Sequence, residues 1–335
     1  MRPLALLVVC ALVIGLIATS GAAQSAGMTW KAAVGAESPD HAVQLQDYFP
    51  RSITVNAGDA ITWTWNTTLA HTVSFLSGAK PPDIVVPQPD KTLLFNPLIT
   101  NPQGGATYAG TGMASSGFVE EQGKTYTLRF TKPGRYVYAC LIHPGMVGTV
   151  VVAPKGAKLP KTQAGYDKDA AAAIASQLAR GEKLRASTGA AKSAGATGTV
   201  YTSPLAALPS ARVSLIAFAP GTLTVKAGDT VRWVMKDPYE IHTITFAGAG
   251  QVPAFVTPAP QPQGPPKIFF NPKGMAPAGG PVHASAETYY NSGVLPPSIA
   301  PGPKAYSLKF TKPGTYVYWC VVHVPQGMRG TIVVR

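Results

Sequence analysis

Two short segments of this chain carry the same set of sulfur and nitrogen donors. In each segment a cysteine is followed within eight residues by a histidine and a methionine, and a single histidine lies far upstream. The two sets are His71, Cys140, His143 and Met146, and His242, Cys320, His323 and Met328. The chain has one other cysteine, Cys10, near its N-terminus. An oxidising compartment would permit a disulfide between Cys140 and Cys320, but each lies in its own donor loop, so we expect free thiols.

The chemistry that this donor set favours is copper binding. A thiolate is a soft ligand, an imidazole is borderline, and a thioether binds hard ions poorly, so the combination selects copper and leaves methionine as a weak axial ligand. Zinc is the main alternative, but structural zinc sites use cysteine and histidine and seldom a thioether. A lone histidine or methionine would carry little weight, whereas four donor types in the same order in both segments do. We therefore predict two type 1 copper ions and electron transfer rather than bond-making catalysis.

The sequence around the donors is repeated as well. Residues 50–59 match residues 220–229, and Tyr126 through His143 matches Tyr306 through His323 without a gap. A repeat of this length indicates two copies of one domain and not a solenoid of short units.

Within each copy, apolar residues alternate with polar ones, which predicts half-buried strands. The alternation is clearest at Ile61, Trp63 and Trp65 and at Val231, Trp233 and Met235. Pro-Gly turns follow at 133–134 and 313–314. Proline fixes φ and glycine accepts positive φ, so both pairs suit tight turns. Short strands separated by such turns predict an all-β fold with one β-sandwich in each half.

The segment between the two copies predicts a helix from Asp167 to Arg185, with acidic residues at its start and basic residues at its end. Residues 187–198 are rich in Ala, Gly and Ser, which is typical of a flexible linker. We expect one domain at 28–155, a helical and flexible linker at 156–198 that acts as a spacer, and a second domain at 199–335.

Both halves resemble cupredoxins, the small blue-copper proteins that include plastocyanin, amicyanin and pseudoazurin. The resemblance covers about 50–152 and 213–334 and is strongest at the two donor loops. It implies a Greek-key β-sandwich in each half, one-electron shuttling, and surface positions for His143 and His323 as electron ports. The loop at Cys140 has the shorter spacing, similar to amicyanin, and the loop at Cys320 the longer, similar to plastocyanin. The resemblance thus implies that the two sites differ in reduction potential.

The chain departs from the family pattern in two ways. The family often has asparagine after the upstream histidine, where it steadies the cysteine loop, but Thr72 and Thr243 stand there, so that role is open. The Pro/Gly-rich stretches 80–117 and 251–295 also lengthen both halves. They would form either a flap beside the copper or decoration of a sheet edge, and we expect decoration because long loops usually elaborate a surface.

The N-terminal residues predict export. Arg2 is followed by an apolar run from Leu4 to Ala18 and then by small residues, which predicts a signal peptide at 1–23. An uncleaved membrane anchor is the alternative. Either would place the protein in the periplasm, at the cell surface or outside the cell.

The net charge of +13 is concentrated in residues 199–335, which carry 11 basic and 4 acidic side chains. This imbalance favours an acidic redox partner docking on the second domain. Nucleic acid is not expected, because the basic residues are scattered and the protein is predicted to be exported.

Two other functions are possible for a protein with these copper ligands. A multicopper oxidase or nitrite reductase needs a further histidine-rich copper cluster, but of six histidines only His41 and His283 lie outside the donor sets. We expect His41 on a surface loop, and we do not assign His283 as a ligand although it could approach the second site. Copper buffering at the cell surface is the other alternative, but the seven methionines form no Met-rich tract. We therefore expect an electron carrier that is not an enzyme.

Overall fold

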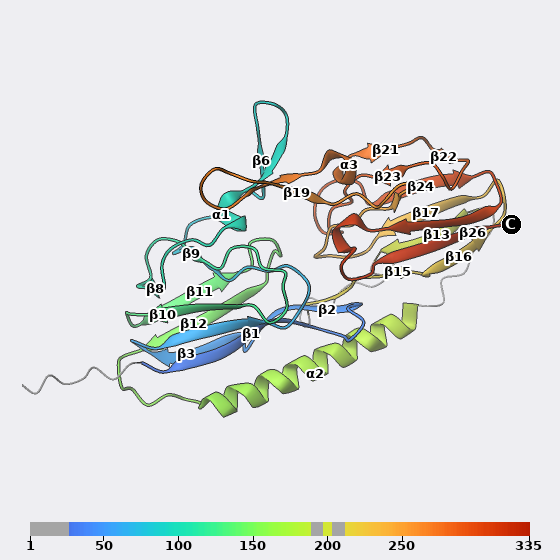
Figure 1. Ribbon diagram of the computed structural model, residues 1–335. Helices are drawn as coiled ribbons and strands as arrows, with labels where there is room; N and C mark the ends of the chain where they lie inside the picture. Colours follow the sequence, from blue (N-terminus) through green and yellow to red (C-terminus); the bar gives the residue numbers. More distant parts are fainter. Residues whose placement is uncertain (1–26, 189–196, 203–211) are drawn as a thin grey trace, which may run out of the picture.

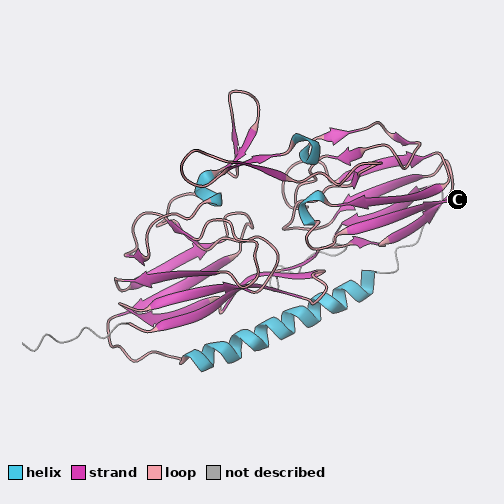
Figure 2. Cartoon of the chain, viewed as in Figure 1, coloured by secondary structure: helices cyan, strands magenta, loops and turns pink. Residues whose placement is uncertain are grey.

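The computed structural model describes residues 27–188, 197–202 and 212–335, which form two β-sandwiches and one long helix (Figure 1). The all-β prediction is confirmed, since strands dominate both halves (Figure 2). The predicted signal peptide and most of the predicted flexible linker lie outside the described residues. Among the residues described, no helix combines the length and apolar character needed to cross a membrane.

The first sandwich consists of a six-stranded sheet, in the order β14-β2-β1-β4-β10-β8, and a five-stranded sheet, in the order β3-β12-β11-β5-β9. The strands are β1 (Thr29–Glu37), β2 (Val43–Phe49), β3 (Ser52–Asn56), β4 (Ala60–Trp65), β5 (Ser74–Phe75), β8 (Thr107–Tyr108), β9 (Ala114–Ser115), β10 (Thr125–Phe130), β11 (Gly134–Ala139), β12 (Val147–Ala153) and β14 (Val213–Leu215). The inward positions predicted from alternation, including Trp63 and Trp65, are fully buried between the sheets.

The second sandwich repeats this plan with a five-stranded sheet, β15-β13-β17-β24-β22, and a six-stranded sheet, β16-β26-β25-β18-β23-β21. The strands are β13 (Thr197–Thr202), β15 (Phe218–Ala219), β16 (Thr222–Val225), β17 (Thr230–Met235), β18 (Thr245–Phe246), β21 (Pro277–Ala278), β22 (Val282–His283), β23 (Tyr290–Ser292), β24 (Ala305–Phe310), β25 (Gly314–Trp319) and β26 (Arg329–Val334). Trp233 pairs with Tyr306 as Trp63 pairs with Tyr126, so the sequence repeat is also a repeat of strand register.

The sequence predicts that the helix between the domains acts as a spacer. In the structure the helix α2 (Gln163–Thr188) instead lies along the first sandwich (Figure 1). Its alanines and three larger apolar residues pack against β2 and β14: Ile174, Leu178 and Leu184. Gly181 lies so close to β2 that a Cβ atom there would come within 2.2 Å of Val43. An alanine-rich face therefore suits this helix, because small residues let it approach the sheet.

The second half of the chain contributes one strand to the first sandwich. Strand β14, which lies within the second predicted domain, pairs antiparallel with β2 and so completes a sheet of the first sandwich. The Gln46 backbone N–H next to it donates to the Arg212 carbonyl at 2.9 Å. The predicted boundary at 199 therefore does not mark where the chain leaves the first sandwich.

The Pro/Gly-rich stretches decorate sheet edges, as expected, because β8, β9, β21 and β22 are the outermost strands of the sandwich sheets. Other parts of the same stretches also form a separate four-stranded sheet, which the sequence did not predict. Strands β6 (Val85–Pro87) and β7 (Leu93–Phe95) come from the first half, and β19 (Val256–Ala259) and β20 (Lys267–Phe270) from the second. They join in the order β19-β20-β7-β6, and Phe95 stacks on Phe270 with ring centroids 5.1 Å apart. A lone two-stranded hairpin is marginal in water, so each hairpin gains stability from the other.

Short helices follow the two inner strands of this sheet. Helix α1 (Pro97–Thr100) follows β7, and α3 (Pro272–Met275) follows β20. Asn96 and Asn271 cap them, each side chain accepting a hydrogen bond from the backbone at the second helical position. The same Phe-Asn-Pro sequence thus ends each inner strand by starting a helical turn.

His283 is enclosed in the aromatic core of the second sandwich. Its ring stacks on Tyr290 with centroids 4.1 Å apart and also contacts Phe246, Phe310 and Tyr316. Neither ring nitrogen has a hydrogen-bond partner among the described residues. Burial therefore lowers the pKa of His283 to about 4.

Replacing His283 with phenylalanine is expected to stabilise the protein more in acid than at neutral pH. Burial disfavours protonation of His283 in the folded state. His283 therefore costs the wild type no stability above its ordinary pKa of 6.5, but the free energy of unfolding decreases as pH falls from 6.5 towards about 4. Urea unfolding at about pH 7.5 and about pH 5 should show the stability difference between variant and wild type growing by roughly 2 kcal/mol in acid. Other acid-sensitive groups are common to both proteins and cancel. A difference that does not change with pH would contradict the buried, neutral imidazole.

Candidate metal centres

The first donor loop connects β11 to β12 in one tight turn. The Cys140 amide donates to the Met146 carbonyl at 3.0 Å, and the Met146 amide donates to the His143 carbonyl at 3.0 Å. Gly145 takes a φ of +82°, which favours glycine at this position. The ladder between β11 and β12 continues directly into these bonds. The sheet therefore fixes the position of the loop on which three of the predicted donors lie.

The structure brings three donors of the first set together. The Cys140 Sγ atom lies 3.4 Å from His143 Nδ1 and 3.8 Å from His71 Nδ1, and the two Nδ1 atoms are 2.9 Å apart. All three residues are buried, and Met146, also fully buried, belongs to the same apolar core as Cys140. His71 reaches the site from a different segment, which is held by a backbone bridge to Val119.

The second set has the same arrangement. Cys320 Sγ lies 3.4 Å from His323 Nδ1 and 3.6 Å from His242 Nδ1. The longer loop begins with a 3-10 turn, η1 (Val321–His323), and closes through Met328, whose carbonyl accepts from the Cys320 amide at 3.1 Å. The two extra residues of this loop are therefore accommodated without displacing its histidine.

The donor atoms of each trio fit a single copper ion. In both trios the ligand atoms lie within 4.8 Å of one another, the scale expected when three donors share an ion at bond lengths of about 2.0–2.3 Å. Both cysteines are free thiols, as expected, and both are buried. Thiolate and imidazole donors in a closed, apolar site suit copper, which would supply a one-electron redox couple there.

Neighbouring histidines lower the pKa of both thiols. Burial alone would raise the pKa of Cys140, but His143 and His71 oppose this and hold the pKa well below its usual range. His323 and His242 have the same effect on the pKa of Cys320. The thiolate is the form that binds metal.

Thr72 and Thr243 take up the role that asparagine has in the family pattern. The Thr72 hydroxyl accepts a hydrogen bond from the Leu141 amide at 2.9 Å, and the Thr243 hydroxyl accepts from the Val321 amide at 3.0 Å. The backbone amides of both threonines lie 3.4 Å from the cysteine sulfurs. Each threonine therefore binds both the cysteine and the residue after it, which answers the question that the sequence left open.

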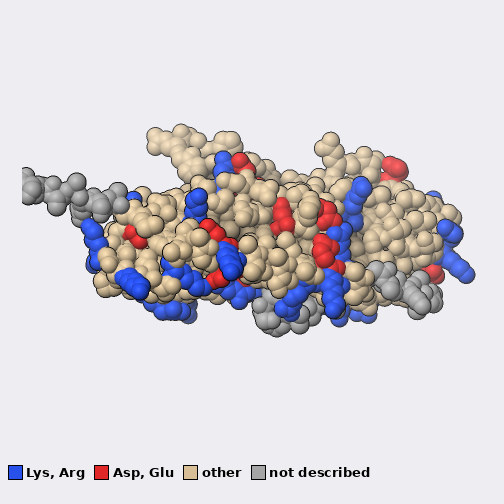
Figure 3. Space-filling model, turned by 90° about the horizontal axis from the view of Figure 1, so that it is seen from below, with Lys and Arg blue, Asp and Glu red and all other residues tan. Residues whose placement is uncertain are grey.

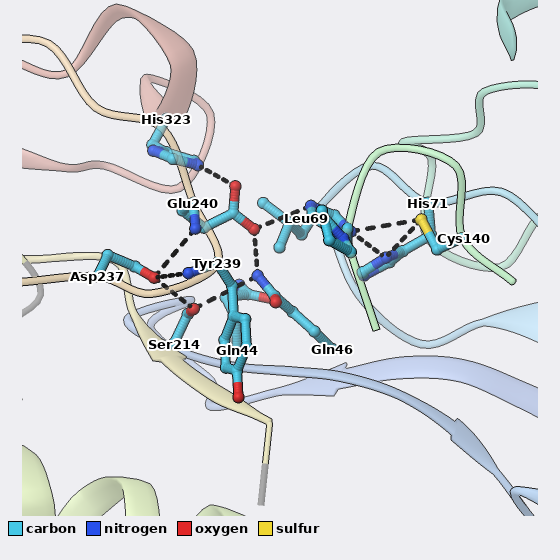
Figure 4. Close-up of polar contacts among 12 residues, drawn as sticks. Gln44, Gln46, Leu69, His71, Cys140, Ser214, Asp237, Tyr239, Glu240 and His323 are labelled. Atoms are coloured by element: carbon cyan, nitrogen blue, oxygen red, sulfur yellow. Dashed lines mark hydrogen bonds and ion pairs between the residues drawn. The ribbon is translucent and has the colours of Figure 1, made fainter. Parts of the chain in front are cut away.

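His143 and His323 do not lie near the surface, which corrects the expectation taken from the family. Their exposed fractions are 4% and 1%, because the two sandwiches meet at these rings. The carboxylate of Glu240 lies between them, 2.9 Å from His143 Nε2 and 3.4 Å from His323 Nε2 (Figure 4). The Gln46 side chain also donates a short hydrogen bond to this carboxylate.

Sequence reasoning missed Glu240, although one signal pointed to it. Glu240 is one of only 4 acidic residues in 199–335, and it lies two positions before His242 in a segment already linked to the site. Burial alone would raise the pKa of Glu240, but His143 and His323 hold it well below its usual range.

The two upstream histidines differ in their surroundings. His242 Nε2 lies 3.2 Å from the carboxylate of the fully buried Asp237, whereas His71 Nε2 is buried without a hydrogen-bond partner among the described residues. A carboxylate on the outer nitrogen makes an imidazole a stronger ligand. The two sites are thus alike in donors but unequal in what supports those donors.

The remaining histidines lie apart from both donor sets. His41 is partly exposed and pairs with Glu37 at 2.8 Å, and His283 is in the aromatic core described above. Among the described residues, the two trios are the groups of three or more histidine, cysteine or acidic side chains arranged to hold a metal ion.

Comparison with known proteins gives the same result for both halves. Residues 38–153 and 207–335 match the model of the copper-binding proteins of the plastocyanin/azurin family. The chain is 32% identical over 121 residues to plastocyanin from Scenedesmus fuscus, a match that covers 36% of this chain and 88% of that protein. It is 31% identical over 100 residues to amicyanin-alpha from Methylorubrum extorquens, covering 30% of this chain and 59% of that protein.

Among solved structures, the copper(I) form of an amicyanin mutant matches with 21% identity and a TM-score of 0.24, covering 42% of this chain and 85% of that one. The two matched regions together span most of the chain. The chain therefore belongs to the plastocyanin/azurin family of copper-binding proteins and contains two cupredoxin domains in tandem.

Proposed function

We propose that this protein is an exported electron carrier with two type 1 copper sites, one in each sandwich. The ligands would be His71, Cys140, His143 and Met146 in the first site and His242, Cys320, His323 and Met328 in the second. The observation that carries the proposal is the convergence of one thiol sulfur and two imidazole Nδ1 atoms in each sandwich. Such a set suits copper in both of its common oxidation states.

The domains of the proposed carrier are 28–155 and 199–335, with 156–198 as the connection and β14 returning to the first sandwich. A signal peptide at 1–23 would direct export. Basic and acidic side chains are interspersed on the face seen from below, with no single basic patch over it (Figure 3). The excess of positive charge in 199–335 still favours acidic redox partners for the second domain.

We favour a carrier over a copper enzyme because the two remaining histidines lie apart from both donor sets and from each other. His41 pairs with Glu37, and His283 stacks on Tyr290. A catalytic copper centre keeps an open position for substrate. All residues of both trios are instead buried, His143 and His323 where the two sandwiches meet. Copper buffering would use the same ligands, and reversible reduction of both sites by a redox partner distinguishes a carrier from a storage protein.

A carrier also benefits from ligands that stay in place when the copper changes oxidation state. Cys140 lies in a loop fixed by the β11–β12 ladder, by its bond to Met146 and by the Thr72 hydroxyl. The Thr72 carbonyl in turn accepts a hydrogen bond from Tyr48 at 2.6 Å. These bonds restrain the loop independently of the metal, which supports small reorganisation on electron transfer.

Replacing Thr72 with valine should loosen the first site and leave the second unchanged. The variant leaves the buried Leu141 amide without its acceptor, which costs about 1–3 kcal/mol of unfolding free energy. Visible and EPR spectra of the oxidised protein should show one altered copper signal and one unaltered signal. Thr243→Val is the matched variant, and it should alter the other signal. Wild-type spectra and stability in both variants would show that the threonines do not restrain the loops.

Replacing Cys140 or Cys320 with serine should remove one copper ion each. Serine is nearly isosteric but lacks the soft sulfur donor, so the altered site would lose its intense visible band. Metal analysis should give two copper ions for each wild-type chain, one for each single variant and none for the double variant. A single variant that retained both blue centres would overturn the ligand assignment.

A further inference from the structure

One carboxylate contacts ligand histidines of both proposed sites. Glu240 lies on the segment between β17 and β18, two residues before His242, and is nearly completely buried. Its Oε1 atom is 2.9 Å from His143 Nε2 in the first sandwich, and its Oε2 atom is 3.4 Å from His323 Nε2 in the second. The two histidines therefore face each other through a single side chain (Figure 4).

The position of Glu240 is fixed from both sandwiches. In the second, Asp237 accepts hydrogen bonds from the backbone amides of Tyr239 and Glu240 at 2.9 and 3.0 Å. The Ser214 hydroxyl, on β14 of the first sandwich, also donates to Asp237 at 3.2 Å. From the first, the Gln46 side chain on β2 donates to the Glu240 carboxylate. Bonds from both sandwiches, linked through Ser214, thus hold the carboxylate where it meets the histidines.

The donor loops also contact the opposite sandwich elsewhere, but without charge. Gln326, on the second donor loop, donates to the Thr68 carbonyl at 2.9 Å, just upstream of His71. The segment 67–70 that precedes His71 contains no acidic residue, so the position equivalent to Glu240 in the first repeat is the apolar Leu69. Glu240 therefore contacts a histidine of each site, whereas Asp237 contacts His242 of the second site.

We propose that Glu240 is a positioning residue common to both sites, which joins the two donor sets into one coupled unit. The proposal rests on the proposed function, because it takes His143 and His323 as copper ligands. Their Nδ1 atoms face the thiols, and Glu240 lies at both outer nitrogens, 2.9 Å from His143 Nε2 and 3.4 Å from His323 Nε2. The second contact is electrostatic and lacks hydrogen-bond geometry, so Glu240 restrains the ring of His143 more tightly than that of His323. In a buried setting a charge acts strongly on groups several ångströms away, so a change at one ring is felt at the other.

The same contacts affect how the protein meets its partners. His143, Glu240 and His323 form a continuous route between the donor sets that contains two non-covalent steps, of 2.9 and 3.4 Å. With exposed fractions of 4% and 1%, neither ring offers a surface to an external protein. The outer edges of these rings therefore serve electron transfer between the two sites and not electron transfer to partner proteins.

The placement of Glu240 is tested by NMR of the reduced, copper-loaded full-length protein. Two imidazole Nε2–H signals, from His143 and His323, should exchange with water at least about 100-fold more slowly than in free imidazole, because both are buried against the Glu240 carboxylate. In Glu240→Gln the amide oxygen can accept from one ring only, so at least one signal should lose this protection. Glu287→Gln removes an exposed charge from the same domain, and Gln326→Ala removes an uncharged loop contact, and both should keep the two signals. Fast exchange of both signals in the wild type would overturn the proposal even if Glu240→Gln failed to fold.

The coupling is tested by redox titration of the same proteins. Loss of the shared negative charge disfavours the oxidised state, so Glu240→Gln should raise the ratio of reduced to oxidised copper about tenfold at a fixed potential, with the larger change at the site of His143. Glu287→Gln should leave both ratios unchanged. Unaltered ratios in Glu240→Gln would refute the coupling. Failure to bind copper at all would instead refute the proposed function, so the two failures are distinguishable.

Discussion

One buried carboxylate contacts a histidine ring of each sandwich at the place where the two sandwiches meet. Burying a carboxylate is costly unless charged or hydrogen-bonding groups surround it. Glu240 meets this requirement only with contributions from both halves, since His143 and Gln46 come from the first and His323 from the second. The two domains are thus more than neighbours on one chain, because each contributes to the surroundings of the other's donor histidine.

The rest of the interface keeps this contact in register. Strand β14 joins the sheet of the first sandwich, helix α2 covers β2 and β14, and the four-stranded sheet of β6, β7, β19 and β20 connects the two insertions. Helix α2 lies between the two repeats and the four-stranded sheet lies in their longest insertions, whereas β14 belongs to the second repeat. Parts of the segments that lengthen this chain therefore contribute to the interface between its domains, together with β14.

Much of the fold and of each metal centre could be predicted because the signals are local. The alternation around Trp63 and Trp233 follows from the period of a strand, and Cys140, His143 and Met146 follow one another on a single loop. Helix α2 begins at Gln163, slightly earlier than the predicted Asp167, because the Thr162 carbonyl accepts from the Tyr166 amide and starts the first turn before the acidic residues.

What could not be predicted depends on contacts between distant segments. The pairing of Leu94 with Phe269 requires both insertions to meet, and neither alone indicates a partner. The burial of His143 depends on Glu240, which lies in the other repeat and has no equivalent in 67–70. Family resemblance placed His143 and His323 near the surface because it describes single domains, and the second domain is what covers them.

The most direct test is a crystal structure of the copper-loaded protein with data collected at the copper absorption edge. The account predicts two anomalous peaks in each chain, one beside Cys140 and one beside Cys320, with the Glu240 carboxylate between the Nε2 atoms of His143 and His323. A copper ion bound away from these cysteines, or a Glu240 side chain turned to solvent with the two rings apart, would contradict it.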